Sequence, residues 1–217
     1  MTRDLFAGME SERTWRDVLC RDAVVLRHFA VVDQAAILAA IRDITSAAPF
    51  RHMVTPGGYS MSVAMTNCGT HGWVTDRSGY RYDALDPQSG KPWPPMPELF
   101  RNLARDAALS AGFQDFEPDA CLINHYAPGA RLSLHQDKNE RDFDEPIVSV
   151  SLGIPAVFLF GGLRRSDKPL RVPLTHGDVV VWGRAARLRY HGVLPLKEDV
   201  HPLVGGQRIN LTFRKAG

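Results

Sequence analysis

Cysteine is scarce in this chain, and its spacing excludes two classes of site. Cys20, Cys68 and Cys121 are the only cysteines among 217 residues, and no two of them form a Cys-x-x-Cys pair. An odd number without that spacing is not the pattern of a disulfide framework or of a structural zinc site. We therefore expect free thiols, a reducing compartment and a cytoplasmic protein.

Long apolar runs and a strong charge imbalance are also missing. No stretch of about 18 apolar residues is available to cross a bilayer, and the opening segment MTRDLFAGMESERTWRDVL lacks the apolar region of a signal peptide. We expect no membrane partner. Lys and Arg number 26 against 24 Asp and Glu, a net charge of +2. That balance is too mild to indicate a nucleic-acid partner by itself.

The length and composition predict one globular domain over residues 1–217. We expect a loosely attached extension at 1–22, a strand at 23–32, and a helix that begins after Asp33 and ends at Pro49. Residues 50–82 alternate in short pieces, which favours a small antiparallel sheet or hairpin lid outside the core. A proline-rich surface loop at 86–97 then precedes a helix that starts at Pro97 and ends near Gly112.

From residue 119 to 214 every segment reads as a strand. The predicted strands are ACLINHY, RLSLH, IVSVSLG, AVFLF, LRVPL, DVVVW, RLRYHGV and RINLTFR. About eight short strands after two helices indicate a mostly β protein with flanking helices, folded as a double-stranded β-helix or jelly roll.

The stretch NHYAPGARLSLHQD, residues 124–137, ends in a possible metal site. His135 and Asp137 are two positions apart, so on a strand they point to the same face. His191, in the apolar and aromatic segment RLRYHGV, is the best candidate for a third ligand. Two imidazoles and a carboxylate form the facial arrangement of non-haem Fe(II) oxygenases. The alternative is a solvated polar strand end, because His-x-Asp alone is common.

The segment RINLTFR predicts a strand with one polar face. Arg208, Asn210, Thr212 and Arg214 share that face, and apolar residues alternate with them. The two arginines are roughly 20 Å apart along a strand, so they do not grip the same carboxylate but are able to bracket a small dicarboxylate. Arginine presents a planar fork that matches a carboxylate. The alternative is an exposed arginine face on an edge strand.

These motifs together resemble the AlkB family of Fe(II)/2-oxoglutarate-dependent nucleic-acid dealkylases, and the resemblance covers about residues 20–214. It implies iron ligation by His135, Asp137 and His191, and use of Fe(II), 2-oxoglutarate and O2. It implies oxidative repair of bases such as 1-methyladenine and 3-methylcytosine in single-stranded DNA or RNA, with release of formaldehyde, succinate and CO2. It makes residues 50–82 a nucleotide-recognition lid. We expect a monomer.

The resemblance also implies two further sets of site residues. Those expected to contact 2-oxoglutarate are Asn124, Tyr126, Arg208, Asn210 and Arg214. Those expected to contact the nucleic acid are Thr55, Tyr59, Met65, Trp73, Tyr80, Asn139 and Arg165. For any single aromatic residue of the lid, simple packing in a small sheet is the alternative. Asn139 departs from the family pattern, where many bacterial members have Asp, and we expect a changed lesion preference.

Two rival functions stay open at this point. One is an Fe(II)/2-oxoglutarate oxygenase that acts on a protein or a small molecule. Such an enzyme would not need the aromatic residues Trp73 and Tyr80 of the lid. The other is a metal-free jelly-roll binding module, which predicts that the purified protein contains no iron.

Overall fold

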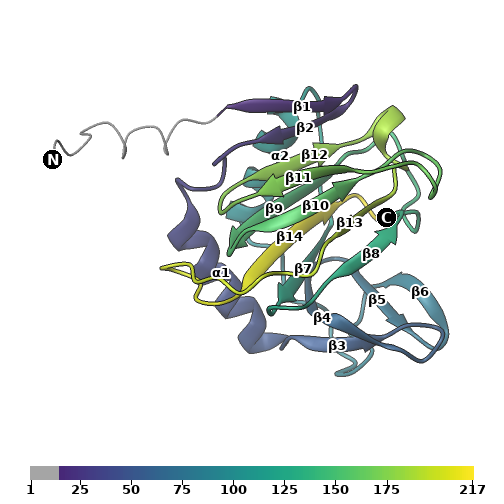
Figure 1. The fold of residues 1–217 in the computed structure, drawn as a ribbon. Helices are drawn as coiled ribbons and strands as arrows, with labels where there is room; N and C mark the ends of the chain where they lie inside the picture. Colours follow the sequence, from purple (N-terminus) through teal and green to yellow (C-terminus); the bar gives the residue numbers. More distant parts are fainter. Residues whose placement is uncertain (1–14) are drawn as a thin grey trace, which may run out of the picture.

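Eight antiparallel strands form the larger sheet of the computed structural model, which describes residues 15–217 (Figure 1). Across the sheet the order is β1 (Arg16–Cys20), β2 (Ala23–Leu26), β12 (Val179–Trp182), β9 (Ile147–Gly153), β14 (Arg208–Arg214), β7 (Ala120–Tyr126), β4 (Ser60–Gly69) and β3 (Arg51–Val54). β14 therefore lies between β9 and β7, in the middle of the sheet.

Four more strands form a smaller sheet that packs on one face of the larger one. Their order is β11 (Leu170–Leu174), β10 (Ala156–Phe160), β13 (His191–Val193) and β8 (Leu132–His135). Side chains of both sheets, such as Phe158, Phe160, Val180 and Trp182, form one buried cluster between them. The prediction of a mostly β, double-stranded β-helix fold is confirmed.

Two helices cover the opposite face of the larger sheet, α1 (Gln34–Ala47) and α2 (Glu98–Ser110). Ile37 of α1 and Phe100 of α2 share a second buried cluster with Leu211 and Phe213 of β14. β14 thus directs its apolar residues toward the helices. Its alternate residues point into the space between the two sheets, where the site lies.

The observed ends of both helices agree with the predicted ends to within about one residue. Asp33 is the N-cap of α1, although its side chain makes no capping hydrogen bond. Pro97 is the N-cap of α2 and not its first helical residue, because its ψ of 145° is extended. Gly112 follows α2 with a φ of +91°, a conformation that glycine adopts without strain.

The N-terminal predictions need two corrections. Residues 16–20, expected in a loose extension, form β1 and pair with β2 at the edge of the larger sheet. The strand expected at 23–32 ends at Leu26, because His28 turns the chain with a φ of +55° and donates its backbone N–H to Asp178. The rest of the expected extension, residues 1–14, lies outside the described residues.

The placement of residues 50–82 outside the core was wrong for its first half. β3 and β4 belong to the larger sheet, and Val63, Met65 and Cys68 of β4 are fully buried. From Val63 to Cys68 both faces of β4 are buried, so Thr66 and Asn67 do not face solvent, whereas Ser60 and Ser62 are exposed. Only β5 (Gly72–Asp76) and β6 (Gly79–Asp83) form a separate two-stranded sheet.

Two later segments also differ from expectation. The proline-rich loop 86–97 is not wholly on the surface, because Trp93 and Met96 are buried and Trp93 packs against Gly72. In RLRYHGV the strand begins only at His191, after a turn. Between residues 15 and 217, no helix has the length and apolar character needed to span a bilayer.

Candidate active site

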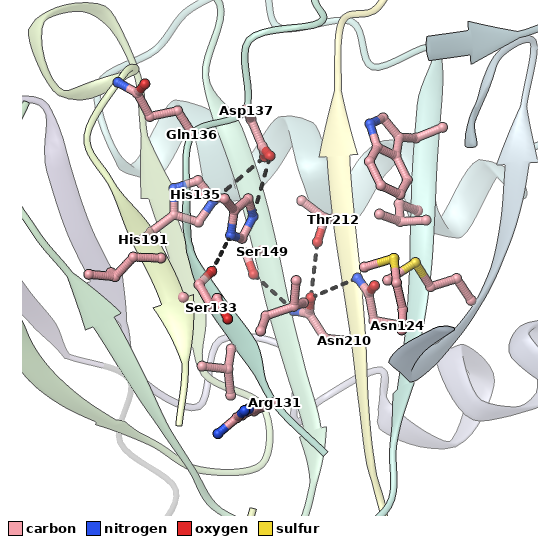
Figure 2. Close-up of a pocket in the computed structure, with 18 of the residues that line it drawn as sticks. Asn124, Arg131, Ser133, His135, Gln136, Asp137, Ser149, His191, Asn210 and Thr212 are labelled. Carbon is pink, nitrogen blue, oxygen red and sulfur yellow. Dashed lines mark hydrogen bonds and ion pairs between the residues drawn. The ribbon is translucent and has the colours of Figure 1, made fainter. Parts of the chain in front are cut away.

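The three predicted metal ligands meet between β8 and β13 (Figure 2). His191 and His135 are direct cross-strand neighbours in the smaller sheet, and Asp137 follows β8 by two residues. One ligand atom from each residue lies within 4.8 Å of the others. Nε2 of His135 is 3.6 Å from Oδ1 of Asp137, and Nε2 of His191 is 3.7 Å from Oδ2. This donor set and spacing fit a divalent iron.

Backbone carbonyl groups fix the orientation of both imidazoles. Nδ1 of His135 donates to the carbonyl of Ser133 at 2.8 Å, and Nδ1 of His191 donates to that of Arg189 at 3.0 Å. Each ring therefore keeps its proton on Nδ1 and leaves the lone pair of Nε2 for a metal beside Asp137. Burial and the neighbouring His191 lower the pKa of His135 to about 4, which keeps this ring neutral at physiological pH.

Arg214 holds one oxygen of the Asp137 carboxylate. Its Nη2 and Nε atoms donate to Oδ2 at 2.5 and 3.0 Å. Burial alone would raise the pKa of Asp137, but the adjacent charge of Arg214 holds it well below the usual range. Asp137 is thus an anion, and within residues 15–217 its Oδ1 atom accepts no hydrogen bond. Oδ1 is the oxygen left for a metal.

Amide and hydroxyl groups line the floor of the site beside the triad. Asn210 donates from Nδ2 to Ser149 and to the carbonyl of Val150, and its Oδ1 accepts from Asn124 and Thr212. These bonds commit Asn210 fully to the protein (Figure 2). Oδ1 of Asn124, which is buried, has no partner among the described residues. A buried polar atom without a partner is costly, so this oxygen fits a ligand with a donor or an ordered water.

Arg208 is the second group with unused hydrogen-bonding capacity. Its side chain is buried, donates from Nη2 to Ser151 at 2.8 Å and lies 4.9 Å above the Tyr126 ring. Its Nε and Nη1 atoms have no partner within the described part of the chain. Burial lowers the pKa of Arg208 and raises that of Tyr126 to about 12. A buried guanidinium with two free donors fits a carboxylate.

A cavity of about 680 Å³ is lined by the three metal-ligand candidates, by Arg208 and Arg214, and by the β5–β6 hairpin, which is called the lid from here on. Trp73 of β5 stacks on Tyr80 of β6, with ring centroids 5.8 Å apart and planes 23° from parallel. The indole N–H of Trp73 donates to Oδ1 of Asn139 at 3.4 Å, which ties the lid to the loop after Asp137. The cavity therefore has an aromatic wall opposite its metal-ligating wall.

Nearly every predicted site residue lies on this cavity. The lining includes His135, Asp137, His191, Asn124, Tyr126, Arg208, Asn210, Arg214, Thr55, Met65, Trp73, Tyr80, Asn139 and Arg165. Tyr59 is the exception, because it is 77 % exposed and is not part of the lining. Arg165 lies at the rim, 5.9 Å from the centroid of Tyr190.

Several residues of the site were not found from the sequence. Ser149 and Ser151 anchor Asn210 and Arg208, and Trp182 contacts His191 edge-on at 5.0 Å. The alternation of IVSVSLG, which points both serines to one face, was the available signal for the first two. Trp182 lay in an apolar strand that carried no functional signal.

Comparisons with known proteins agree with this geometry. The family model of the 2OG-Fe(II) oxygenase superfamily matches residues 22–214. The chain is 59% identical over 214 residues to the alpha-ketoglutarate-dependent dioxygenase AlkB of Escherichia coli, covering 99% of this chain and 98% of the relative. It is 34% identical over 121 residues to the mouse nucleic acid dioxygenase ALKBH1, covering 56% of this chain and 31% of the relative. The solved structure of OsALKBH1 superimposes with a TM-score of 0.81 at 29% identity, covering 93% of this chain and 100% of that one.

Proposed function

Because this chain belongs to the 2OG-Fe(II) oxygenase superfamily and, within it, to the AlkB dioxygenases, we propose that it dealkylates N-alkylated bases in nucleic acid. It is an Fe(II)/2-oxoglutarate-dependent dioxygenase that consumes O2. The substrates proposed are 1-methyladenine and 3-methylcytosine in single-stranded DNA or RNA. The products proposed are formaldehyde, succinate, CO2 and the unmodified base.

One observation carries the proposal, namely that a single cavity has metal ligands on one wall and a pair of stacked aromatic rings on the other. A base must leave its stack before its N-alkyl group reaches an enzyme's reactive centre, and flat side chains replace the lost stacking. Trp73 and Tyr80 supply flat surfaces at the lid, and the imidazole of His135 supplies another across the cavity. An oxygenase of a small polar metabolite has no need of such a wall.

The roles proposed for the cofactor residues follow from their free atoms. Nε2 of both histidines and Oδ1 of Asp137 are assigned to iron. The unpaired Nε and Nη1 donors of Arg208 are assigned to the distal carboxylate of 2-oxoglutarate, with Tyr126 beneath the guanidinium. When bound, iron and 2-oxoglutarate supply the oxidation of the N-alkyl carbon. The protein's part is to hold the co-substrate at a fixed angle and to exclude water.

Arg214, Asn124 and Asn210 belong to the same assignment with different tasks. Arg214 fixes Asp137 and lines the cavity, and it is assigned to the keto-acid end of 2-oxoglutarate. Asn124 contributes its free Oδ1, whereas Asn210, which lines the cavity and whose amide is bonded to protein groups, is assigned to support Asn124 beside the co-substrate.

The substrate residues proposed are those of the lid and rim. Met65, Asn139, Arg165 and Thr55 line the cavity. Met65 and Asn139 are assigned to the base, and Arg165 and Thr55 to the backbone of the nucleic acid. Tyr59, being exposed, is assigned to the backbone outside the cavity. We propose a cytoplasmic monomer that prefers single strands, because a base in a single strand leaves its stack at least cost.

The test is formaldehyde release from a methylated oligonucleotide. The natural protein with Fe(II), 2-oxoglutarate and O2 is expected to release formaldehyde from a single-stranded oligonucleotide with 3-methylcytosine and none from the unmodified one. Asp137→Ala is expected to release none. The alternative outcome is that methylated oligonucleotides do not stimulate 2-oxoglutarate turnover but a methylated peptide does. That result would indicate a protein substrate.

A further inference from the structure

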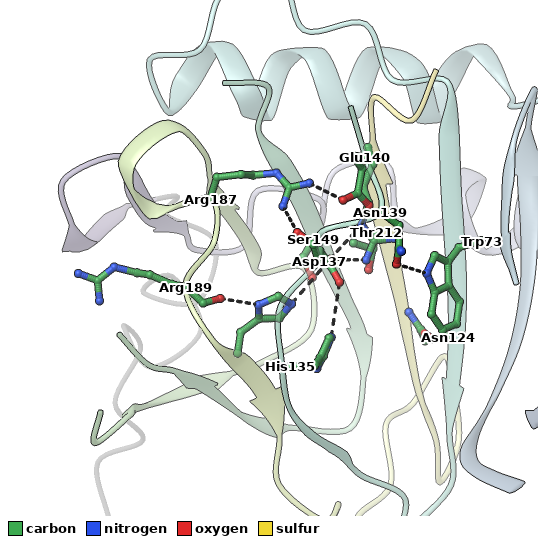
Figure 3. A network of polar contacts seen from close by, with 12 residues as sticks. Trp73, Asn124, His135, Asp137, Asn139, Glu140, Ser149, Arg187, Arg189 and Thr212 are labelled. Atoms are coloured by element: carbon green, nitrogen blue, oxygen red, sulfur yellow. Dashed lines mark hydrogen bonds and ion pairs between the residues drawn. The ribbon is translucent and has the colours of Figure 1, made fainter. Parts of the chain in front are cut away.

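A buried cluster of charges lies behind the Asp137 side of the metal centre (Figure 3). Glu140 is at its centre, three residues after Asp137. Its Oε2 accepts from Nη2 of Arg187 at 2.9 Å, and its Oε1 lies 3.5 Å from Nε of Arg214. Arg187 also donates from Nη1 to the backbone carbonyl of Asp137 at 2.7 Å. Glu140 and Arg187 are both buried.

The cluster balances its charges only when Glu140 is included. Asp137 and Glu140 are the two acids, and Arg187 and Arg214 are the two bases. If Glu140 were neutral, Arg187 would be a buried cation with no carboxylate among the described residues, and Arg214 would have only Asp137. A buried charge that lacks a counter-charge is strongly unfavourable. The positive charge of the arginines would then interact more strongly with the Asp137 carboxylate and compete with a metal for it.

Glu140 also joins the metal centre to the lid. The hydroxyl of Tyr82, on β6, donates to Oε1 of Glu140 at 2.5 Å. β6 pairs with β5, which places Trp73 directly opposite Tyr82. A chain of direct contacts thus runs from the aromatic lid through Tyr82 and Glu140 to the arginines that hold Asp137.

We propose that Glu140 is a positioning residue of the metal centre: it compensates Arg187 and shares Arg214, which leaves Oδ1 of Asp137 free for iron. Arg187 in turn fixes the backbone carbonyl of Asp137, so the loop keeps its ligand in place before the metal arrives. Groups behind a metal ligand commonly act in this way. The proposal requires the iron centre of the family but not the nucleic-acid substrate proposed above.

Co(II) binding measured by titration calorimetry and by the visible spectrum of the bound ion tests this role without turnover. Glu140→Gln is expected to bind Co(II) about 10–100-fold more weakly than the natural protein, with an altered spectrum. Glu117→Gln is the matched control, because Glu117 is exposed and pairs with Arg105 at the surface. The double variant Glu140→Gln/Arg187→Gln restores the charge balance, and its new amide at position 187 is still an N–H donor for the backbone carbonyl of Asp137, so it is expected to recover most of the lost affinity.

Three results would overturn the proposal. The first is a folded Glu140→Gln protein, by circular dichroism, that binds Co(II) with the natural affinity and spectrum. The second is a double variant as weak as the single one, since charge compensation would then not be the cause. If Glu140→Gln does not fold, Glu140→Asp decides, because it keeps the negative charge but draws the carboxylate back from Arg187 and Arg214 and should therefore also weaken Co(II) binding. Unchanged Co(II) affinity in that variant is the third contrary result.

Discussion

Arg208 and Arg214 lie on the same face of β14 but have different surroundings. Arg214 is bound to Asp137 and close to Glu140, so its guanidinium is largely occupied by the protein. Arg208 makes one hydrogen bond, to Ser151, and keeps two donors unpaired within the described residues. At the scale of single residues, therefore, the two arginines differ: Arg214 is paired with Asp137, and Arg208 keeps donors with which we propose it binds a carboxylate.

Arg208→Lys is expected to weaken 2-oxoglutarate binding. Lysine keeps the charge but loses the planar fork, and a hydrogen bond to a charged group contributes about 1.5–3 kcal/mol. The dissociation constant for 2-oxoglutarate should rise by roughly 10–150-fold in an anaerobic titration with Fe(II) present. Arg171→Lys, at an exposed position of β11, is the control and should bind 2-oxoglutarate normally. An unchanged constant in Arg208→Lys would remove Arg208 from the co-substrate site.

Asn139→Asp is expected to change which lesions are preferred. Both side chains accept a hydrogen bond from Trp73, so that contact is kept, but only the amide is also able to donate. The Asp variant should gain rate on 1-methyladenine and 3-methylcytosine, which carry an exocyclic amine, relative to 3-methylthymine, which carries a carbonyl at that position. Steady-state rates on oligonucleotides with each lesion measure this. Identical ratios in the two proteins would show that Asn139 does not read the base.

At the scale of elements, the β5–β6 hairpin carries the aromatic wall and is held by its backbone. Asn67 of β4 accepts from the N–H of Trp73 and donates to its carbonyl, both at 3.0 Å. Tyr82 anchors the other strand to Glu140. The indole of Trp73 adds one long hydrogen bond, to Asn139, so the hairpin keeps its other anchors when the indole is removed.

Trp73→Ala is expected to weaken the binding of a methylated oligonucleotide and to leave the metal centre intact. A base stacked on an aromatic side chain gains roughly 1–3 kcal/mol, so the dissociation constant by fluorescence anisotropy should rise about 5–150-fold. Affinity for 2-oxoglutarate should not change. Leu109→Ala, on the exposed side of α2, serves as control. Natural affinity for the oligonucleotide in Trp73→Ala would remove the lid from the substrate site.

The elements that could be predicted from the sequence are those whose two faces differ. β14 alternates between polar and apolar residues, and His135 and Asp137 follow from a spacing of two at the end of β8. β1 could not be predicted, because a short charged edge strand has no such alternation. β4 was misplaced since both of its faces are buried. Glu140 and Arg187 were missed because their contact joins positions 47 apart, which no local pattern reveals.

At the scale of the whole molecule, His176, His201 and His28 lie close together outside the metal centre. They come from the loop before β12, the loop before β14 and the loop after β2. The rings of His176 and His201 stack at 4.1 Å, and Nδ1 of His176 accepts from the backbone N–H of Gly153. Burial, and then the proximity of His201 and His28, lowers the pKa of His176 to about 4, although nearby Asp178 acts in the opposite direction. Neutral imidazole is thus the form compatible with the fold.

Stability is therefore expected to fall in mild acid. The pKa of His176 is 6.5 in the unfolded chain and about 4 in the folded protein. Between these values the folded protein binds fewer protons than the unfolded chain. The stability contributed by neutral His176 is therefore complete above pH 6.5 and is lost as the pH falls toward 4. Partial exposure limits the effect to about 1–2 kcal/mol. His176→Asn keeps an acceptor for Gly153 and should flatten the dependence in urea denaturation at pH 7.5 and 4.5. Parallel curves for the two proteins would contradict this.

The central claim is that His135, Asp137 and His191 bind one iron to which 2-oxoglutarate then adds. An anaerobic titration of Fe(II) into the protein with 2-oxoglutarate, followed by the visible charge-transfer absorption of the complex, tests it most directly. The natural protein should saturate at one iron per chain, and Asp137→Ala, checked for folding by circular dichroism, should show no such absorption. An Asp137→Ala protein that develops the same band with the same affinity would contradict the account.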